Sequence, residues 1–187
     1  MSDAAPPRLV YIIRHAEKPD GAGGSVGVDV EGNPDPHSLV PRGWQRSGAL
    51  GVLFTAGVDA LVTPDRLICP DYGATTAVHR TYQTLRGLAG LAARSIESPF
   101  PEGSEAALAT AVTTHYSGTV LICWEHHRIP DIAAGLPTTA APPTEWPADR
   151  FDLIWQFTLT AADPPTYEFA VLDQHALGEN RQPATPA

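Results

Sequence analysis

The chain has 187 residues, of which 43% are hydrophobic, and this is enough to fill the core of one compact domain. Its formal net charge of -9 argues against a nucleic-acid backbone or an anionic membrane as the main partner, because an acidic surface attracts neither. Any anion-binding site must therefore be a local cluster of cationic side chains.

The cysteines and the ends of the chain predict a soluble cytoplasmic protein. Cys69 and Cys123 both lie inside apolar runs, where a reduced and buried thiol is more common than a disulfide. The start, MSDAAPPR, has no basic region followed by an apolar stretch, and no run of about eighteen apolar residues occurs in the sequence. We expect a single domain over 1–187, with an ordered core from about 8 to 175 and a flexible C-terminal tail, GENRQPATPA.

In the first half of the chain, strand-like runs alternate with helical periodicity. The run RLVYIIR (8–14) is β-branched and aromatic, which is typical of a strand buried on both faces, and a glycine- and proline-rich loop follows it over 20–41. A helix is predicted from Pro41 to about Gly57, and DRLICP predicts a second strand at 66–69. The next helix is predicted between 75 and 94, from an apolar stripe with spacing 4, 3, 4, 3 formed by Val78, Tyr82, Leu85, Ala89 and Ala92.

The second half completes an α/β pattern. SEAALATAVTTHY predicts a helix with Ser104 as its N-cap, GTVLICW a buried strand, and HHRIPDIAAGL a short helix that begins near Pro130. FDLIWQFTL and TYEFAVLDQ then predict two strands of a hairpin. Because parallel neighbouring strands need a crossover, usually a helix, we expect a three-layer sandwich with a mainly parallel central sheet and helices on both faces.

Polar side chains of similar chemistry follow three of the predicted strands. Ligands of open α/β sheets bind beyond the carboxyl ends of the strands, so we expect these side chains to meet at one edge of the sheet. They are Arg14, His15 and Glu17 after the first strand, His79 and Arg80 after the second, and Glu125, His126 and His127 after the strand at 119–124.

This set of residues favours a phosphate site. Arg14 and Arg80 can bind phosphoryl oxygens in a bidentate way, and backbone N–H groups of a helix that begins near Thr76 would add to them. A histidine among arginines is disfavoured in its protonated form, so His15 would present a neutral ring nitrogen that can attack phosphorus. His126 would hold an oxygen of the transferring group, and a carboxylic acid would protonate the leaving oxygen.

Four segments resemble the histidine phosphatase superfamily, which includes cofactor-dependent phosphoglycerate mutases and many small phosphatases. RHAEKP resembles its Arg-His-Gly-Glu signature, LVPRGWQRSGAL its following helix start, TAVHRTYQTL its second arginine segment, and VLICWEHHRIP the strand before its second histidine. The resemblance implies that His15 is the phosphorylated nucleophile and that Arg14, Arg80 and His126 bind the phosphoryl group. We expect His127 to contact the substrate.

The proton donor has no matching motif. In the mutase-like branch of the family the acid lies on the loop after the second arginine's helix, and here we favour Glu102, with Glu97 and Glu105 as alternatives. Glu125 is a further alternative. Ala16 replaces the usual glycine of the signature, which is a mild change.

Other charged residues have simpler interpretations. Glu17 and Lys18 are expected to form an exposed pair. Arg42 and Arg46 are expected on a solvated helix face, although Arg46 also matches the helix-start pattern of the family. His79 is expected to be a surface residue of the helix.

The sequence predicts a phosphomonoester hydrolase that acts on a small phosphorylated substrate through phosphohistidine, without a metal or another cofactor, because the arginines and histidines supply the positive charge. A mutase-like phosphotransferase is the nearest alternative, but the chain lacks the long insertions of the mutases. A metal-dependent hydrolase using Glu17, His15, His126 and His127 and a non-catalytic phosphate-binding domain are the other hypotheses. The sequence carries no signal for a particular oligomeric state.

Overall fold

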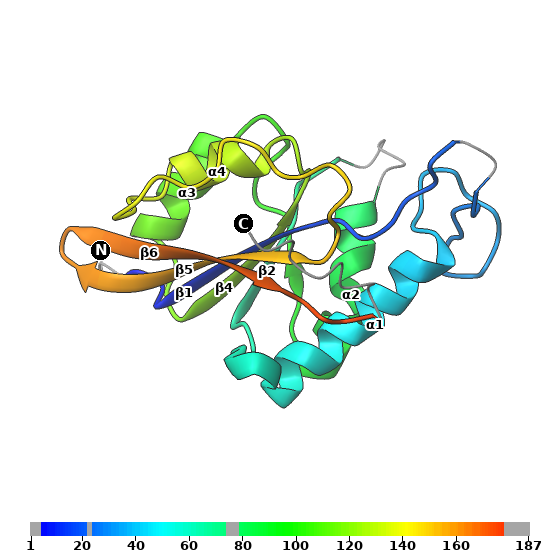
Figure 1. The fold of residues 1–187 in the computed structure, drawn as a ribbon, viewed down its shortest axis with the longest axis horizontal. Coiled ribbons are helices and arrows are strands. Elements are labelled where there is room, and N and C mark those ends of the chain that lie inside the picture. The colour runs from blue at the N-terminus through cyan, green and yellow to red at the C-terminus, as the bar shows by residue number, and fades with distance from the viewer. Residues whose placement is uncertain (1–4, 22–23, 74–78, 178–187) are drawn as a thin grey trace, which may run out of the picture.

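The computed structural model describes residues 5–21, 24–73 and 79–177, and in them it has the predicted α/β architecture (Figure 1). Six strands form one sheet in the order β3-β2-β4-β1-β5-β6. The strands are β1 (Leu9–Arg14), β2 (Arg66–Ile68), β3 (Ile96–Glu97), β4 (Thr119–Trp124), β5 (Leu153–Ala162) and β6 (Pro165–Asp173). The helices are α1 (Pro41–Ala56), α2 (Arg80–Ala92), α3 (Glu105–Thr114) and α4 (Ile129–Ala134), with a short 3-10 helix, η1, at Val58–Ala60.

The parallel half of the sheet contains β3, β2, β4 and β1, while β5 and β6 form the predicted antiparallel hairpin. β1 and β4 pair in register from Leu9 opposite Thr119 to Arg14 opposite Trp124. The two strands therefore end side by side, and the residues that follow them leave the sheet at the same edge.

Alternate side chains of β1 pack into two separate hydrophobic cores, one on each face of the sheet. The sheet and the helices on its two faces therefore form three layers. Val10 and Ile12 pack with Leu108 of α3 and Ile132 of α4. Tyr11 and Ile13 point to the other face of the sheet, as successive strand residues must, and pack with side chains of α1 and α2, which include Leu50, Phe54, Leu85 and Leu88. Figure 1 shows α3 and α4 on one side of the sheet and α1 and α2 on the other.

α1 begins and ends where the sequence predicts. Pro41 occupies the first helical turn, and Gly57 ends the helix in the left-handed conformation with φ 66°, where glycine carries no Cβ penalty. Helix α1 packs closely on α2, since a Cβ added to Gly87 of α2 would lie 2.1 Å from the carbonyl oxygen of Ser47. Only glycine allows this approach.

The buried stripe of α2 differs from the predicted one. Tyr82 is 43% exposed, whereas Thr81, Thr84 and Leu88 are fully buried. The reason is hydrogen bonding: the Thr84 hydroxyl accepts a bond of 2.8 Å from the Ala16 N–H, so a polar residue occupies the face that periodicity assigns to apolar ones. The predicted stripe residue Val78 and the predicted helix start at Thr76 lie outside the described residues.

The remaining expectations hold with small differences. Both cysteines are free and buried. Ser104 precedes α3 as predicted but makes no side-chain cap hydrogen bond. The C-terminal tail from residue 178 lies outside the described residues. Within 5–21, 24–73 and 79–177, none of the helices has the length and apolar character needed to cross a lipid bilayer.

Candidate active site

His15 leaves the carboxyl end of β1 as a buried, neutral imidazole. Its Nδ1 lies 2.7 Å from the carbonyl oxygen of Ala16, and since a carbonyl only accepts, Nδ1 carries the proton and donates. The remaining ring nitrogen, Nε2, keeps its lone pair. Burial, reinforced by the charge of Arg14, lowers the pKa of His15 to about 3, so the ring is neutral at physiological pH.

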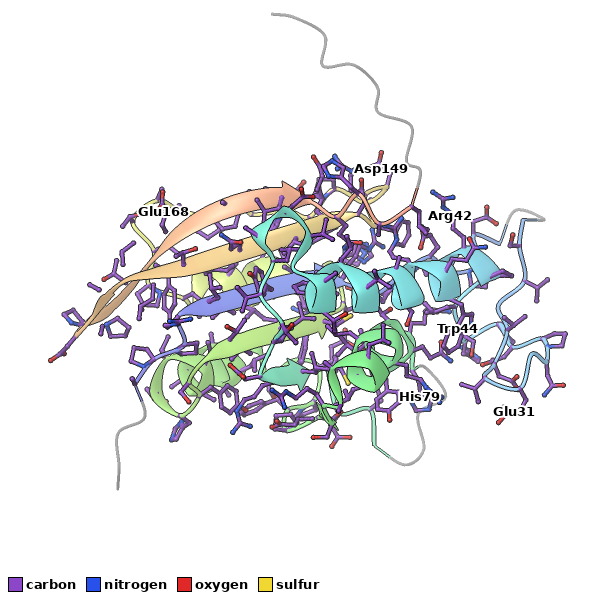
Figure 2. All side chains as sticks on the ribbon, turned by 90° about the horizontal axis from the view of Figure 1, so that it is seen from below. Glu31, Arg42, Trp44, His79, Asp149 and Glu168 are labelled. Atoms are coloured by element: carbon purple, nitrogen blue, oxygen red, sulfur yellow. The ribbon has the colours of Figure 1, made fainter. Side chains whose placement is uncertain are left out.

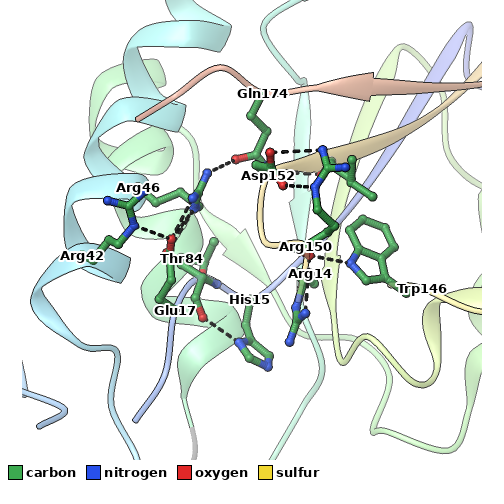
Figure 3. Close-up of polar contacts among 12 residues, drawn as sticks. Arg14, His15, Glu17, Arg42, Arg46, Thr84, Trp146, Arg150, Asp152 and Gln174 are labelled. Carbon is green, nitrogen blue, oxygen red and sulfur yellow. Dashed lines mark hydrogen bonds and ion pairs between the residues drawn. The ribbon is translucent and has the colours of Figure 1, made fainter. Parts of the chain in front are cut away.

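Arg14, the last residue of β1, holds its guanidinium beside His15. One Nη donates to the Ala148 carbonyl at 2.7 Å, and the guanidinium carbon lies 3.9 Å from the ring centre of Phe151. Burial lowers the pKa of Arg14 to about 10, which still leaves it cationic at neutral pH. Figure 3 shows the Arg14 guanidinium and the His15 ring pointing to the same side of the sheet edge.

His126 follows β4 and joins this group from the neighbouring strand. Its ring centre lies 6.0 Å from that of His15, with the rings nearly perpendicular. Its Nδ1 lies 2.6 Å from Oε1 of Glu125 and 3.4 Å from an Nη of Arg14. Burial first, and then the charge of Arg14, lower its pKa below the usual value. The exposed ring of His127 stacks on His126 with centres 3.8 Å apart.

Arg80 reaches this edge through its helix, and its guanidinium points to the neighbouring loop. It begins α2, and its carbonyl accepts a hydrogen bond from Thr84, whose hydroxyl also binds the Ala16 N–H next to His15. The guanidinium donates to the Pro36 carbonyl at 2.9 Å. The structure therefore brings Arg14, His15 and His126 together, and it places the first turn of α2 beside them.

Two of the predicted phosphate ligands have unsatisfied donors. In the described part of the chain, the buried side-chain nitrogen and oxygen atoms without a hydrogen-bond partner are Nε of Arg14, Nε of Arg80 and the hydroxyl of Tyr167. A buried donor without an acceptor costs about 1–3 kcal/mol, and more for charged groups. Each guanidinium therefore keeps a donor that an anion could satisfy.

Two of the four candidate proton donors serve the fold. Glu105 is buried and accepts hydrogen bonds of 2.9 Å from the Trp124 indole and from the Gly103 N–H. Burial raises its pKa, but these two bonds outweigh that effect, so the pKa lies below the usual value. Glu97 on the edge strand β3 forms an ion pair at 2.8 Å with Arg66 of the neighbouring strand β2.

The other two, Glu102 and Glu125, have pKa values shifted in opposite directions. Partial burial raises the pKa of Glu102, and the negative charges of Glu125 and Glu105 raise it further, which favours the protonated acid. Burial also raises the pKa of Glu125, but the hydrogen bond from the His127 N–H and the nearby imidazoles outweigh it, so this pKa is lowered. Glu125 is thus the ionised partner of the two.

The same groups have the spacing of a metal cluster. One nitrogen each of His15 and His126 and one oxygen of Glu125 lie within 4.8 Å of one another. The Arg14 guanidinium, 3.4 Å from His126, would repel a cation and attract an anion there. The ionised Glu125 acts in the opposite direction, so Arg14 and Glu125 have opposing effects on a charged ligand at this edge.

Among known proteins, the likeness is one of three-dimensional structure. No protein-family model and no curated protein sequence matches the chain. The solved structure of a mycobacterial glucosyl-3-phosphoglycerate phosphatase with inorganic phosphate matches 90% of this chain and 98% of its own, with a TM-score of 0.54 and 13% sequence identity. The chain shares the fold of this phosphatase. A structure of the open reading frame Rv3214 from Mycobacterium tuberculosis covers 91% of this chain and 99% of its own, with 14% identity and a TM-score of 0.46.

Within this fold, the expectation for Arg46 was wrong. Arg46 is 2% exposed instead of lying on a solvated face, and its guanidinium binds both carboxylate oxygens of Glu17 at 2.7–3.2 Å (Figure 3). Glu17 is consequently partly buried and paired with Arg46, so the expected exposed pair with Lys18 was also wrong. Arg42 is exposed, as expected, and lies 3.3 Å from the same carboxylate. His79 is exposed at the start of α2, as predicted.

Sequence reasoning missed two features of the site. Phe151 covers Arg14 and lies 6.1 Å from the His15 ring, but its segment reads only as the approach to a strand. The contact between Glu125 and His126 was also missed, although a glutamate directly before a histidine at a strand end is a visible signal. A separate open pocket of about 740 Å³ lies over the start of α1, beside Val30, Trp44 and Arg86, and none of the predicted site residues lines it. Figure 2 shows two of its lining residues, Glu31 and Trp44, at the same end of α1.

Proposed function

We propose that the chain hydrolyses small phosphomonoesters through a phosphohistidine formed on His15. The observation that carries this proposal is the buried, neutral His15 ring, whose Nδ1 is held by the Ala16 carbonyl and whose Nε2 keeps a lone pair next to the cationic Arg14. A fixed nucleophile beside a fixed cation is what attack on a phosphoryl group needs. The fold neighbour, itself a phosphatase with bound inorganic phosphate, supports the same reaction class.

In the first half-reaction, Nε2 of His15 attacks phosphorus and the bond to the leaving oxygen breaks. Arg14, Arg80 and His126 bind the phosphoryl oxygens, and the unpaired Nε atoms of both arginines offer further donors. Glu102, whose pKa is raised by burial and by Glu125, gives its proton to the leaving oxygen. The alcohol departs, and water then releases phosphate from His15.

The positive charge at the site suffices for this reaction without a metal or another cofactor. Arg14 remains cationic at neutral pH and would repel a metal ion bound next to it. His127, exposed and stacked on His126, is placed to contact the substrate outside the phosphoryl group. The free, buried cysteines are consistent with a reducing cytoplasmic environment.

A mutase-like phosphotransferase and a non-catalytic phosphate-binding domain are the competing functions. Hydrolysis is favoured over transfer because the chain has no long insertion that would enclose a phosphorylated product and retain it at His15. Catalysis is favoured over binding because Glu102 and Glu125, with opposite pKa shifts, provide the acid and the carboxylate that a turnover cycle uses.

The deciding experiment compares the wild type with His15→Ala on a chromogenic phosphate ester, with and without a chelator. We expect turnover in the wild type that survives the chelator, and a mass increase of one phosphoryl group that is stable in alkali and labile in acid. His15→Ala should lack both signals. His115→Ala is the matched control, because His115 is exposed just before the start of β4, at the opposite end of the strands.

Each competing function gives a different result. A binding domain would show no turnover in either protein while retaining affinity for inorganic phosphate. A phosphotransferase would form phosphohistidine but release phosphate far more slowly than it passes the group to an added alcohol acceptor. A metal-dependent hydrolase would lose its activity in the chelator and recover it when a divalent ion is returned.

A further inference from the structure

The contact between Glu125 and His126 determines how the His126 imidazole is protonated. Oε1 of Glu125 lies 2.6 Å from Nδ1 of His126. The lowered pKa of Glu125 means that its carboxylate is ionised and can only accept, whereas the Arg14 Nη that lies 3.4 Å from the same Nδ1 can only donate. The carboxylate is much the closer of the two, so we assign the proton to Nδ1. His126 is neutral, since burial and Arg14 lower its pKa, and its Nε2 is therefore a lone-pair acceptor.

Both oxygens of Glu125 are engaged in holding this arrangement. Oε1 contacts His126, while Oε2 accepts the backbone N–H of His127 at 2.7 Å. Glu125 is thus fixed in place and is better suited to orient His126 than to take up a proton itself. A carboxylate that fixes one nitrogen of an imidazole leaves the other nitrogen as a general base.

His126 is close enough to His15 to act on a group attached there. A nitrogen of each ring lies within 4.8 Å of the other, and the ring centres are 6.0 Å apart. At this separation, a phosphoryl group on His15 would lie close to the His126 ring. A water molecule attacking that phosphorus would be within reach of the His126 ring.

We propose that Glu125 and His126 form a carboxylate–imidazole pair that takes the proton from the water that hydrolyses phosphohistidine 15. The water oxygen forms the new bond to phosphorus, the bond from phosphorus to Nε2 of His15 breaks, and its electron pair returns to that nitrogen. The water proton goes to Nε2 of His126 and then to solvent. The proposal rests on the proposed function and assigns its second half-reaction.

The two half-reactions then use different groups. Glu102 gives a proton to the departing alcohol in the first, and the Glu125–His126 pair removes one from water in the second. Glu102 regains its proton from solvent before the next turnover. In this scheme Glu125 is a positioning residue, and Nε2 of His126 can donate to a phosphoryl oxygen only after it has taken the proton from water. With a nitrophenyl leaving group, which departs without the proton of Glu102, disturbing Glu125 should slow only the second half-reaction.

The test is a rapid-mixing experiment with Glu125→Gln and para-nitrophenyl phosphate. A glutamine can donate to Nδ1 and so favour the tautomer that carries its proton on Nε2, which removes the base. We expect nitrophenol release to begin with a burst close to one equivalent per enzyme, followed by a steady rate reduced roughly 10²–10⁴-fold. Alkaline-quenched samples should contain mostly phosphorylated protein.

The matched control is Glu168→Gln, which removes the same charge at an exposed position of β6. Glu168 pairs with Thr158, which pairs with Leu9 at the start of β1, so it lies at the far end of the strands from Arg14 (Figure 2). It should behave like the wild type. As a second measurement, phosphate release in His126→Ala should be restored in part by added imidazole, since a free base can replace the missing one.

The outcomes separate this inference from the proposed function. A wild type without phosphohistidine 15 overturns the function itself. A wild type that forms phosphohistidine, together with a Glu125→Gln enzyme that slows both half-reactions equally or neither, overturns only the assignment to Glu125. If Glu125→Gln does not fold, failure of imidazole to accelerate phosphate release in His126→Ala overturns the base role.

Discussion

The carboxylate of Glu17 forms a bidentate ion pair with the buried guanidinium of Arg46, at distances of 2.7–3.2 Å. Glu17 stands two residues after His15, and Arg46 lies in α1, where it also donates to the side chain of Gln174 after β6 at 3.1 Å. The buried guanidinium of Arg46 therefore connects three parts of the chain: helix α1, the segment after β1 and the segment after β6 (Figure 3).

Replacing Arg46 with methionine should destabilise the protein strongly. The change leaves the carboxylate of Glu17, whose side chain is only 14% exposed, without its main partner. Removing one partner of a buried ion pair costs roughly 3–5 kcal/mol, because the other charge remains buried and uncompensated. Urea unfolding would measure this loss of free energy.

Arg42→Met is the control for Arg46→Met, since Arg42 contacts the same carboxylate at 3.3 Å but has a side chain that is 51% exposed. An exposed pair contributes about 0–1 kcal/mol, so this variant should unfold almost like the wild type. If both variants lose the same free energy of unfolding, burial does not make the Arg46–Glu17 ion pair more important for stability than the exposed pair.

The buried His15 should make the protein sensitive to mild acid. Its folded pKa of about 3 is below the usual 6.5, so between these values the unfolded chain binds a proton that the folded chain does not. Stability is therefore complete above pH 6.5 and falls as the pH decreases towards 3. From pH 7 to pH 4 this loss is on the order of 3 kcal/mol.

A comparison of His15→Gln with the wild type isolates this effect. The variant should lose about 3 kcal/mol less free energy of unfolding than the wild type over that pH range, because glutamine does not titrate. His115→Gln, at an exposed site, should follow the wild type. If all three proteins lose stability in parallel as the pH falls, the conclusion that His15 is buried in its neutral form is wrong.

The backbone architecture could be predicted from the sequence because the central strands are buried on both faces. LVYIIR and TVLICW became β1 and β4, and the polar residues after them meet because these strands are parallel neighbours in register. Arg14, His15 and His126 meet because of the strand topology alone. Short-range patterns in the sequence are enough to indicate this topology.

Buried polar contacts between distant segments could not be predicted in this way. Arg46 reads as a surface residue by helical period, and its partners Glu17 and Gln174 are 29 and 128 positions away. Thr84 reads as polar too, yet it is buried because its hydroxyl binds the backbone next to His15. Helical periodicity assigns such polar residues to the exposed face. Only the folded structure shows the hydrogen-bond and ion-pair partners that offset the cost of burying them.

Glu102→Gln should reduce the hydrolysis of alkyl phosphates much more than that of para-nitrophenyl phosphate. Its raised pKa, caused by burial and by Glu125, suits a proton donor, and an alkoxide leaves poorly without one. General acid catalysis is worth roughly 10²–10⁴-fold, so we expect a loss of that size for a sugar phosphate and a small one for the nitrophenyl ester. Steady-state kcat/KM for both substrates measures the difference.

Glu97→Gln is the control for Glu102→Gln, because Glu97 pairs with Arg66 on the edge of the sheet. It should leave the ratio of the two kcat/KM values unchanged. Glu105→Gln should lower stability through its bond to Trp124 but keep the same ratio. A ratio that responds to Glu105 and not to Glu102 would transfer the acid role to Glu105.

Arg80→Gln should weaken the binding of inorganic phosphate. In the structure the Arg80 guanidinium donates to the Pro36 carbonyl, and its Nε is buried without a partner, so a donor remains for an anion at the start of α2. Hydrogen bonds to charged groups contribute about 1.5–3 kcal/mol, which corresponds to a roughly ten- to hundredfold rise in the inhibition constant of phosphate.

Arg94→Gln removes the same charge near the other end of α2, where the side chain is 45% exposed, and should leave that constant unchanged. If Arg80→Gln lowers only the unfolding temperature, Arg80 anchors the loop at Pro36 and the phosphate is held by the residues of β1 and β4.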